Sequence, residues 1–574
     1  MSDTNEIFKS AYKWALKNAY DHSGKAIDRA VISKVIAEMP WAKSDIQTLK
    51  SEVERAVQLV NSMSIEEIEH ALTELDPKLL EKKRGEEEKR ALPPLPGAVK
   101  GAVVTRLPPE PSGYMHIGHA LSGLINYLYK EMYDGKLWLR FEDTDPRKAK
   151  AEYYESFRDG YTWLGIKWDY EKNNSDDIPL MYEYAERLIS QGKAYACLCR
   201  QEELRKKRAL GEACIHRSMS RDWSLEQWDR MLSGHYREGE ISIRLMGDLK
   251  SMNTALRDPV LLRIVNHPHP LCGEKYLVWP TYDFAVSIED ALCGVTHVLR
   301  TSEFMFRDEL QDMIRRYLGL PNPVYVEYSR FEFEGTPVAK REIRELITSG
   351  LVKGWDDPRL ATIMAVRRRG ILPEALREFV LRYTALTTTK KEYSWDLLYA
   401  INRRIIDSAA PRLFFVPEPV KLVLSGLGGK VIEAPLHPTS DLGKRKLQVS
   451  SQLYVPRRDA EKFNVGDKFR LKYLANCRVI EKGEDYILAE AREGEPEPGI
   501  EIIQWAPEDS HEIRIIIPGQ LFRNEEFQVD SLKTVTGLVE PYEAGIKIGM
   551  RVQFERFGYC IKDPEPKTYI FIHQ

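Results

Sequence analysis

Apolar and polar positions change their spacing along the chain and divide it into regions. Residues 1–80 carry apolar side chains at intervals of three and four, most clearly over 26–39 and 46–63, which predicts a helical N-terminal domain. Residues 81–97 are first almost entirely charged and then rich in proline, a composition typical of a solvated linker.

From residue 98 onward, short β-branched runs alternate with loops and amphipathic stretches. The runs GAVVTRL and KLWLRFED are each followed by helical periodicity, which predicts βαβ units and a parallel sheet. We expect this α/β domain in two halves, 98–194 and 271–325, with the alternation resuming at VWPTYDF after a Cys- and Arg-rich insert over 195–270. Residues 326–412 are predicted to be mainly helical, and short alternating runs over 413–574 predict one or two small β-barrels.

Composition narrows the class of protein. The 574 residues include 43% hydrophobic and 30% charged side chains, which excludes a collagen-like or largely disordered chain. A formal net charge of −3 excludes a globally basic coat protein for nucleic acid, although a local basic face remains compatible with it. We find neither an apolar run of the ~20 residues that a membrane span needs nor a secretory signal. We therefore expect no membrane association. The seven cysteines are an odd number, which argues against a framework of disulfides, so we expect a reducing, cytoplasmic location.

The densest chemical signal is Pro109–His119, PEPSGYMHIGH, between a predicted strand and a predicted helix. The first turn of a helix offers unpaired N–H groups and a positive dipole end, which suit a phosphate. Gly113 and Gly118 let a ligand approach the backbone, and His116 and His119 are three residues apart, so both can face one phosphate chain. A bare H-x-G-H is equally compatible with two capping or core histidines. The strand–loop–helix context favours the phosphate site.

Cysteines form a second signal. Cys197-x-Cys199 and Cys214-x-His216 are two pairs with 14 residues between them, a complete tetrahedral ligand set for Zn²⁺. Because no ligand position would remain for water, such a site would be structural and would stabilise the insert. The alternative is four unrelated residues in a reducing compartment.

Five motifs in this order carry a resemblance to a known family: PEPSGYMHIGHA, LRFEDTDP, PTYDF, GVTHVLRTSEF and KGWDDPRL. Together they resemble the class I aminoacyl-tRNA synthetases of the glutamyl/glutaminyl subgroup, and within it the archaeal type of glutamyl-tRNA synthetase. The resemblance runs from about residue 98 to the C-terminus. It implies a Rossmann-like catalytic domain, an acceptor-stem-binding insert that carries a zinc site in related enzymes, a helical stem-contact region with a KMSKS-type loop and two anticodon-binding β-barrels. The N-terminal 80 residues carry no such motif, and their role stays open between a protein partner, tRNA and support of the catalytic domain.

The resemblance also implies a reaction. The protein would activate L-glutamate with ATP, accompanied by Mg²⁺, to glutamyl-adenylate and transfer it to the 3′-terminal adenosine of tRNA(Glu), with tRNA(Gln) left open. His116 and His119 would bind phosphate and the transition state, and Lys340 would neutralise the departing pyrophosphate. Other ATP-binding positions implied by the family are Glu110, Pro111, Ser112, Gly118, Thr301, Arg330, Phe331, Val338 and Ala339.

One position departs from the family pattern. The KMSKS counterpart is Pro337–Arg341, and the serine usual in this subgroup is Ala339 here. A hydroxyl contact to ATP is therefore absent, from which we expect slower activation. Lys340 is retained, so we expect an active enzyme.

Four residues match the amino-acid pocket. Arg106 matches the arginine that meets the substrate side chain, Glu142 the acid that holds the α-amino group, and Tyr282 a further contact. Arg300 stands where the glutaminyl pattern resembles cysteine, and an arginine pairs with a carboxylate but would be left unpaired beside an amide. Val286 stands where that pattern tends to histidine, so both positions favour glutamate. The alternative for Arg300 is a structural salt bridge.

Several other functions remain as alternatives. A glutamine–tRNA ligase is disfavoured by Arg300 and Val286, and a truncated enzyme that glutamylates a modified tRNA nucleoside would lack the barrel region. A nucleotidylyltransferase for a small cofactor also uses H-x-G-H but needs neither PTYDF nor an anticodon module. A tRNA-binding paralogue without catalysis is suggested by Ala339 alone. Ten Lys/Arg against five Asp/Glu over 361–412 predict contacts with a nucleic-acid backbone, or a solvated helix face.

Overall fold

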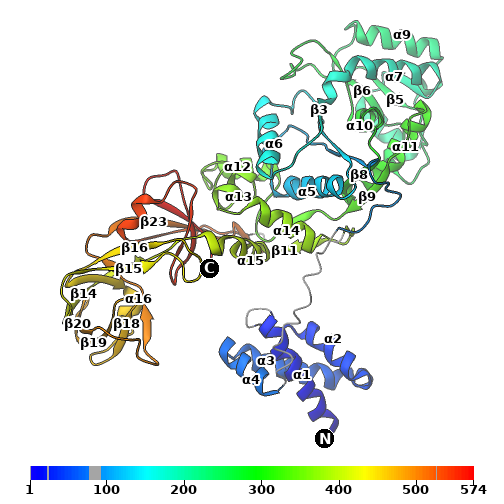
Figure 1. Cartoon of the computed structure of the whole chain (residues 1–574). Coiled ribbons are helices and arrows are strands. Elements are labelled where there is room, and N and C mark those ends of the chain that lie inside the picture. The colour runs from blue at the N-terminus through cyan, green and yellow to red at the C-terminus, as the bar shows by residue number, and fades with distance from the viewer. Residues whose placement is uncertain (1, 22–24, 76–91, 385, 525) are drawn as a thin grey trace. The chain divides into compact units, whose positions relative to one another are not determined.

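The computed structural model describes residues 2–21, 25–75, 92–384, 386–524 and 526–574 (Figure 1). The chain divides into two compact units, Met1–Arg90 and Ala91–Gln574. Of the predicted linker over 81–97, residues 81–91 lie outside the described residues. None of the described helices is long and apolar enough to cross a membrane.

The N-terminal unit is helical, as its periodicity predicts. It consists of α1 (Ser2–Asp21), α2 (Asp28–Glu38), the 3₁₀ helix η1 (Pro40–Ser44), α3 (Ile46–Asn61) and α4 (Ile65–Leu75). Apolar residues three or four positions apart, such as Leu49, Val53, Val57 and Val60 of α3, are buried in one core between the helices.

A parallel sheet forms the centre of the second unit. Its elements are β1 (Val104–Leu107), α5 (Ile117–Met132), β2 (Lys136–Phe141), α6 (Ala151–Trp163) and β3 (Tyr170–Asn173), with the parallel order β1-β2-β3. β8 (His297–Thr301) pairs in parallel with β9 (Val324–Tyr328) and lies beside β1, since the N–H of Thr296 donates to the carbonyl oxygen of Val104 at 3.0 Å. The βαβ prediction is therefore confirmed. The carboxyl ends of β1, β2 and β8 meet at one edge, where ligands of such sheets bind.

An antiparallel sheet interrupts the parallel one. It follows α7 (Ile178–Ser190) and has the order β4 (Ala194–Cys197), β5 (Ser242–Leu245), β6 (Val260–Ile264) and β7 (Val278–Pro280). The helices α7, α9 (Arg221–Leu232) and α10 (Tyr282–Leu292) contact its strands, α11 (Asp308–Leu318) packs on α7 and α10, and α8 (Gln201–Leu210) follows β4 in the chain. The strand VWP was expected to resume the parallel alternation, but β7 pairs antiparallel with β6. A three-residue apolar strand has the same pattern in either sheet, so only its tertiary partner decides its membership.

Residues 326–412 contain more helix than strand, in the direction of the helical prediction. They comprise β10 (Phe331–Phe333), α12 (Lys340–Thr348), α13 (Ile363–Arg368), α14 (Pro373–Tyr383), β11 (Lys391–Tyr393) and α15 (Trp395–Ile406). The start of α13 braces the histidine loop, because Thr362 forms a β-bridge with His116 and the N–H of Ile117 donates to the carbonyl oxygen of Ala361 at 2.8 Å.

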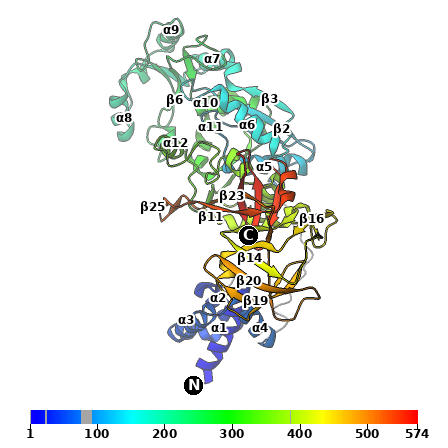
Figure 2. The same ribbon diagram turned by 90° about the vertical axis from the view of Figure 1, so that its left-hand side faces the viewer.

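Two seven-stranded sheets make up the C-terminal region. The first contains β14 (Pro419–Ser425), β17 (Gln452–Pro456), β18 (Lys468–Leu471), β19 (Ala475–Lys482), β20 (Tyr486–Arg492), β21 (Glu501–Ile503) and β22 (Ala506–Pro507). The second contains β12 (Arg412–Leu413), β13 (Phe415–Pro417), β23 (His511–Pro518), β26 (Leu532–Val539), β27 (Arg551–Phe554), β28 (Gly558–Lys562) and β29 (Thr568–His573). Figure 2 shows β14, β19 and β20 together in one sheet and β23 in the other. Each sheet encloses its own apolar core, which confirms the two barrels implied by the resemblance.

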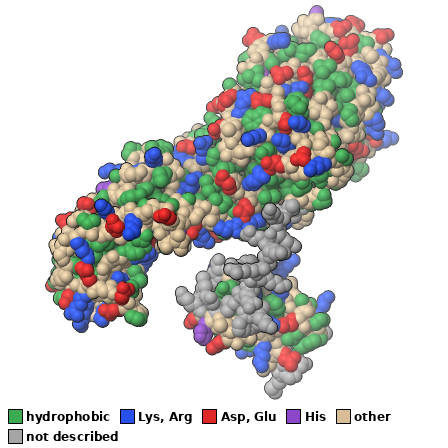
Figure 3. Space-filling model, viewed as in Figure 1, with side chains coloured by type: hydrophobic (Ala, Val, Ile, Leu, Met, Phe, Trp, Pro, Cys, Tyr) green, Lys and Arg blue, Asp and Glu red, His purple; other side chains and the backbone are tan. Residues whose placement is uncertain are grey.

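The basic residues over 361–412 are largely engaged within the protein. Arg368 pairs with the buried carboxylate of Asp563 in the second barrel at 2.8 Å, and the buried guanidinium of Arg369 lies 4.2 Å from the ring centroid of Trp395. Arg377 pairs with Glu131 of α5 at 2.6 Å. Acidic and basic side chains are also interspersed over the face drawn in Figure 3. These arginines therefore fasten the helical region to its neighbours as well as adding positive charge.

Candidate active site

A cavity of about 570 Å³ opens at the carboxyl ends of β1, β2 and β8. The predicted residues in its wall are Arg106, Glu110, His116, Gly118, His119, Glu142, Tyr282, Arg300, Thr301, Arg330 and Phe331. The predicted residues Pro111, Ser112, Val338, Ala339 and Lys340 lie outside this wall. Residues of the wall that sequence reasoning missed include Asn126, Thr144, Lys148, Asn174, Phe304 and Arg307. Thr144 and Phe304 lie within the motifs LRFEDTDP and GVTHVLRTSEF, whereas the other four lie in none of the five motifs.

The two histidines complete the first turn of α5. His116 is the N-cap: its Nδ1 accepts the N–H of Gly118 at 3.1 Å, and Nδ1 of His119 accepts the N–H of His116 at 3.3 Å. A Cβ at position 118 would lie 3.0 Å from Cε1 of His116, so glycine leaves room for the ring to fold back. The histidines therefore act as the reciprocal cap that polar side chains provide at many helix starts.

Capping also sets the chemical form of both rings. Each Nδ1 accepts a backbone N–H, so the proton of the neutral ring lies on Nε2. Burial, with a contribution from the positive charge of Arg330, lowers the pKa of His119 to about 4 and holds the pKa of His116 well below its ordinary value. Near neutral pH the two rings are consequently uncharged, and each has one Nε2–H donor to offer at the cavity wall.

Lys340 lies beside this loop rather than in the cavity wall. It is the first residue of α12, whose N-cap Ala339 makes no side-chain hydrogen bond. Its side chain passes over Gly113, where a Cβ would come within 3.0 Å of Lys340 Cδ, and its Nζ lies 5.0 Å from the ring centroid of Tyr153. Burial and the nearby positive charge of Arg344 lower the pKa of Lys340. A cation thus stands next to the histidine loop although 221 residues separate Lys340 from His119.

Two residues of the cavity wall, Arg106 and Glu142, take part in buried ion pairs. Nε of Arg106 donates to Oδ1 of Asp290 at 3.0 Å, and Nη1 of Arg140 donates to the same oxygen at 2.7 Å. Nη2 of Arg140 donates to Glu142 at 3.3 Å. Nη1 of Arg106 is buried and has no hydrogen-bond partner among the described residues. Since a buried donor without a partner is costly, this N–H is suited to an anionic ligand.

Glu142 has an unusual pKa for a carboxyl group. Removal from water raises the pKa of Glu142 to about 7, although the positive charges of Arg140 and Arg106 oppose the rise. The group is therefore poised between its neutral and ionised forms at neutral pH, and a ligand cation would stabilise the ionised form.

Arg300 is held more tightly than its predicted role requires. The guanidinium, 6% exposed, pairs with Asp308 at the start of α11, and its Nη1 donates to Gln311 at 3.1 Å. Its Nε also lies 3.7 Å from Glu327 of β9. Arg300 lines the cavity, but two carboxylates already counter its charge. In this structure both the predicted site role and the salt-bridge alternative have observations in their favour.

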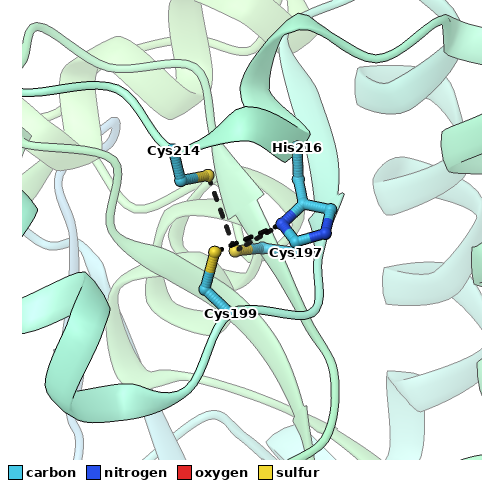
Figure 4. Close-up of side chains that lie close together, drawn as sticks. All are labelled: Cys197, Cys199, Cys214 and His216. Carbon is cyan, nitrogen blue, oxygen red and sulfur yellow. Dashed lines mark hydrogen bonds between the residues drawn. The ribbon is translucent and has the colours of Figure 1, made fainter.

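The four predicted metal ligands converge in the antiparallel part of the fold. Cys197 ends β4, Cys199 follows it, and Cys214 and His216 flank the start of a 3₁₀ turn, with all four ligand atoms within 4.8 Å of one another (Figure 4). The sulfur atoms of Cys197 and Cys214 are 3.8 Å apart, and Nδ1 of His216 is 3.2 Å from the sulfur of Cys199. Zn–S bonds of about 2.3 Å in a tetrahedron place sulfurs about 3.8 Å apart, so the donor set and spacing fit Zn²⁺.

Comparisons with known proteins agree with this geometry. Residues 102–408 match the catalytic domain of the class I tRNA synthetases (E and Q), and residues 410–491 and 502–563 match two anticodon-binding domains of the same family. The chain is 40% identical over 570 residues to a glutamate–tRNA ligase of Nitrosopumilus maritimus, which covers 99% of this chain and 100% of that protein. It is 42% identical over 566 residues to a glutamate–tRNA ligase of Pyrococcus furiosus, with 96% of this chain and 97% of that protein covered.

A solved glutamate tRNA ligase of Elizabethkingia meningosepticum aligns with a TM-score of 0.41 at 19% identity, over 54% of this chain and 71% of that chain. The family matches extend across both the catalytic and the barrel regions, and the relatives align over nearly their full length. The resemblance inferred from the five motifs is thus confirmed, and the chain belongs to the class I tRNA synthetases of the E and Q group.

Proposed function

We propose that the protein is a glutamate–tRNA ligase that joins L-glutamate to the 3′-terminal adenosine of tRNA(Glu) with consumption of ATP. The observation that carries this proposal is one cavity with two chemically different sides. One side has neutral histidines at a helix start, and the other has a buried arginine N–H that no described residue accepts, beside a carboxyl group of raised pKa. The first side suits a nucleotide phosphate, and the second suits an amino acid that carries two carboxylates and an ammonium group.

In the first step, an oxygen of the substrate α-carboxylate bonds to the α-phosphorus of ATP, the bond to the β-phosphate oxygen breaks, and pyrophosphate leaves. The Nε2–H groups of His116 and His119 would donate to phosphate oxygens as negative charge develops there, and Lys340 would neutralise the pyrophosphate. Mg²⁺ would arrive bound to the ATP phosphates and neutralise part of their charge. No nucleophile of the enzyme is required, because the two substrates react when they are held in line.

In the second step, a hydroxyl of the terminal ribose attacks the carbonyl carbon of the adenylate, and AMP leaves. Thr301, Arg330 and Phe331 would surround the adenosine, with the Glu110–Ser112 turn at its edge, as the family pattern implies. Val338 and Ala339 would reach ATP together with Lys340. These three residues lie outside the cavity wall in this structure, so their contacts require the nucleotide to extend beyond it.

Selectivity for glutamate would come from buried cations. The free Nη1 of Arg106 would pair with the side-chain carboxylate, and Glu142 would hold the α-ammonium group, with Tyr282 beside them. A neutral amide could accept this N–H with its oxygen but carries no negative charge, so the charge-assisted pair would be lost. Arg300 would add positive charge to the same pocket from its position between Asp308 and Glu327.

The cysteine cluster would hold one Zn²⁺ through Cys197, Cys199, Cys214 and His216. Four protein ligands leave no position for water, so the ion would stabilise the insert and take no part in the reaction. Metal analysis of the purified protein should give one zinc per chain, and the Cys199→Ser variant should lose it. Preparations in which the wild-type chain and this variant hold the same amount of zinc would exclude the site.

The barrels would bind the anticodon loop, and the basic residues over 361–412, within the stem-contact region 326–412, would meet the tRNA stem. Acceptance of tRNA(Gln) besides tRNA(Glu) depends on base contacts within these barrels. A protein partner is a further proposal for the N-terminal helices. The cytoplasm is the proposed location, because a thiolate zinc cluster and tRNA charging both belong to a reducing compartment.

The decisive measurement is aminoacylation of total tRNA with labelled glutamate and, in parallel, with labelled glutamine. Charging with glutamate alone is the expected result, and sequencing of the charged tRNA would then distinguish tRNA(Glu) from tRNA(Gln). Charging with glutamine instead would overturn the specificity. Binding of tRNA without charging by either amino acid would identify a paralogue that has lost catalysis.

A further inference from the structure

One buried carboxylate, that of Asp290, contacts Arg106 directly and reaches Glu142 through Arg140. Asp290 of α10 is 1% exposed and meets three arginines that come from three different elements. Arg106 of β1 and Arg140 of β2 both donate to Oδ1, at 3.0 and 2.7 Å, and Nη2 of Arg315 in α11 lies 3.4 Å from Oδ2. No motif of the sequence marks Asp290, and 184 residues separate it from Arg106.

We propose that Asp290 is a positioning residue that holds Arg106 of the proposed glutamate pocket, and Arg140 behind Glu142, in the geometry that binding needs, an inference that rests on the proposed function. A guanidinium is planar, so fixing its Nε fixes the direction of its other N–H groups. The bond from Nε of Arg106 to Asp290 leaves Nη1 buried, without a partner among the described residues, in a side chain that lines the cavity. Asp290 therefore determines where the pocket offers its N–H to a substrate carboxylate.

The same oxygen acts on Glu142 through Arg140. Nη1 of Arg140 is bound to Asp290, and its Nη2 donates to Oε1 of Glu142. Both the group proposed for the side-chain carboxylate and the group proposed for the α-ammonium are thus restrained by one atom. Neither Asp290 nor Arg140 is among the residues that line the cavity, so both act through their neighbours.

The far side of Asp290 is anchored as well. Arg315 donates from Nε to the carbonyl oxygen of Ser287 at 3.1 Å and from Nη1 to the hydroxyl of Tyr325 at 2.7 Å. Because Arg315 is fixed by these two bonds, its contact with Oδ2 keeps the carboxylate from rotating. The contacts thus run from Arg315 to Asp290, and from Asp290 to Arg106 in the cavity wall and to Arg140 behind Glu142.

The negative charge of Asp290 gives the proposal a measurable consequence, a change in the pH dependence of activity, that a purely structural role would not produce. The charged groups that face Glu142 are Arg140 from β2, Arg106 from β1 and Asp290 from α10, and among them only Asp290 raises the pKa of Glu142. Removal of the Asp290 charge should therefore favour ionised Glu142 at lower pH. A variant that is merely less stable would leave the pH dependence of its folded fraction's activity unchanged.

The test compares Asp290→Asn with Asp459→Asn in the full-length chain. Asp459 is also fully buried and accepts hydrogen bonds from Arg556 at 2.7 and 3.0 Å, with Lys462 and Arg458 at 3.7 and 3.9 Å, but it lies in the barrel region. For Asp290→Asn we expect KM for the amino acid to rise about tenfold or more, with KM for ATP changed by less than about twofold. The acid limb of kcat/KM for the amino acid should move to lower pH by about one unit. Asp459→Asn should reproduce the loss of stability and neither kinetic change.

A second variant keeps the test decisive if Asp290→Asn fails to fold. Arg315→Lys loosens the far anchor of Asp290 and does not touch the cavity, so KM for the amino acid should rise about threefold with KM for ATP unchanged. Equal changes in both KM values, or no change in either variant, would overturn the proposal.

The kinetics are measured with whichever amino acid the wild-type chain attaches to tRNA. If that amino acid is not glutamate, the proposed function is refuted, but the same measurements still test the role of Asp290. If the wild-type chain charges none, a crystal structure of Asp290→Asn decides. Arg106 and Arg140 must then leave their wild-type positions, and unchanged positions would refute the role.

Discussion

The starts of α5 and α12 are both proposed to bind the phosphates of ATP, but only the start of α5 is capped by side chains. At α5, the histidines proposed to bind phosphate are also the cap, since His116 and His119 accept the first backbone N–H groups of the helix. At α12, the proposed pyrophosphate-binding Lys340 is the first helical residue, and Ala339 before it provides no side-chain cap. One helix start is thus completed by its functional groups, and the other is left without such a bond.

This difference teaches how far stability and activity can be separated. At α5, a substitution of a histidine removes a donor to ligand and a partner of the backbone together. At α12, the functional amine takes no part in capping, so its removal should affect the reaction and hardly affect folding. A lysine at a helix start even opposes the positive end of the helix dipole.

The largest expected effect comes from separating the two roles of His116. Asparagine caps helices well but lacks the Nε2–H donor, so His116→Asn should lower kcat/KM by about 10²- to 10³-fold with little change in melting temperature. His116→Ala should lose activity similarly and also lose about 0.5–2 kcal/mol of stability. Aminoacylation kinetics and denaturant unfolding measure the two effects. An active asparagine variant would mean that His116 serves only as a cap.

At the other helix start, Lys340→Met removes the charge and keeps much of the side-chain length. The rate of glutamyl-adenylate formation should fall about 10²-fold, because the departing pyrophosphate loses its cation. The free energy of unfolding should stay the same or rise by about 0.3–1 kcal/mol, since an unfavourable charge at the helix start is removed. Pyrophosphate exchange in the presence of tRNA, with calorimetry on the same sample, tests both statements. A clear loss of stability would contradict the comparison.

The acid range of pH distinguishes the histidines from Glu142. With a pKa of about 4, His119 stays neutral above pH 5, so KM for ATP should be nearly constant between pH 6 and 8. Glu142, with a pKa of about 7, becomes protonated below that value and can no longer attract the substrate ammonium group. KM for glutamate should therefore rise about tenfold per unit well below pH 7. A KM for ATP that rises in parallel would show that the histidines become charged in this range.

The smallest expected effect restores the missing cap. Ala339→Ser introduces the best type of N-cap side chain before Lys340 and should stabilise α12 by about 1 kcal/mol. Slower amide exchange in the first turn of α12 would report the bond, and KM for ATP should fall by a few-fold. Ala339→Gly serves as the control without a hydroxyl. Identical exchange in both variants would show that the serine does not cap this helix.

Sequence reasoning reached the parts of the site in which chemistry is local. The histidine pair with its glycine, Cys197 with Cys199, and Cys214 with His216 are each close neighbours in sequence, so spacing alone brings the atoms within each pair together, while the fold brings the two cysteine pairs together. The strand VWP and the residues Asn126 and Arg307 lacked such a signal, since an apolar tripeptide or a single polar residue fits many positions. Arg300 shows the same limit: its pattern predicted a cation, whereas the carboxylates of Asp308 and Glu327 that restrain it come from α11 and β9.

By itself, the sequence determined most of the succession of elements, the helix start that carries the histidines and the family, and it proposed the metal-ligand set. These features depend on short stretches of sequence, namely backbone preferences, local spacing of side chains and short motifs. Such local properties do not depend on what packs around them. Only the tertiary structure decided which charges remain available for a ligand. Asp290, Arg106, Arg140 and Arg315 come from four elements far apart in the chain. Whether a buried cation is neutralised or free depends on which carboxylates the packing brings within about 3 Å of it.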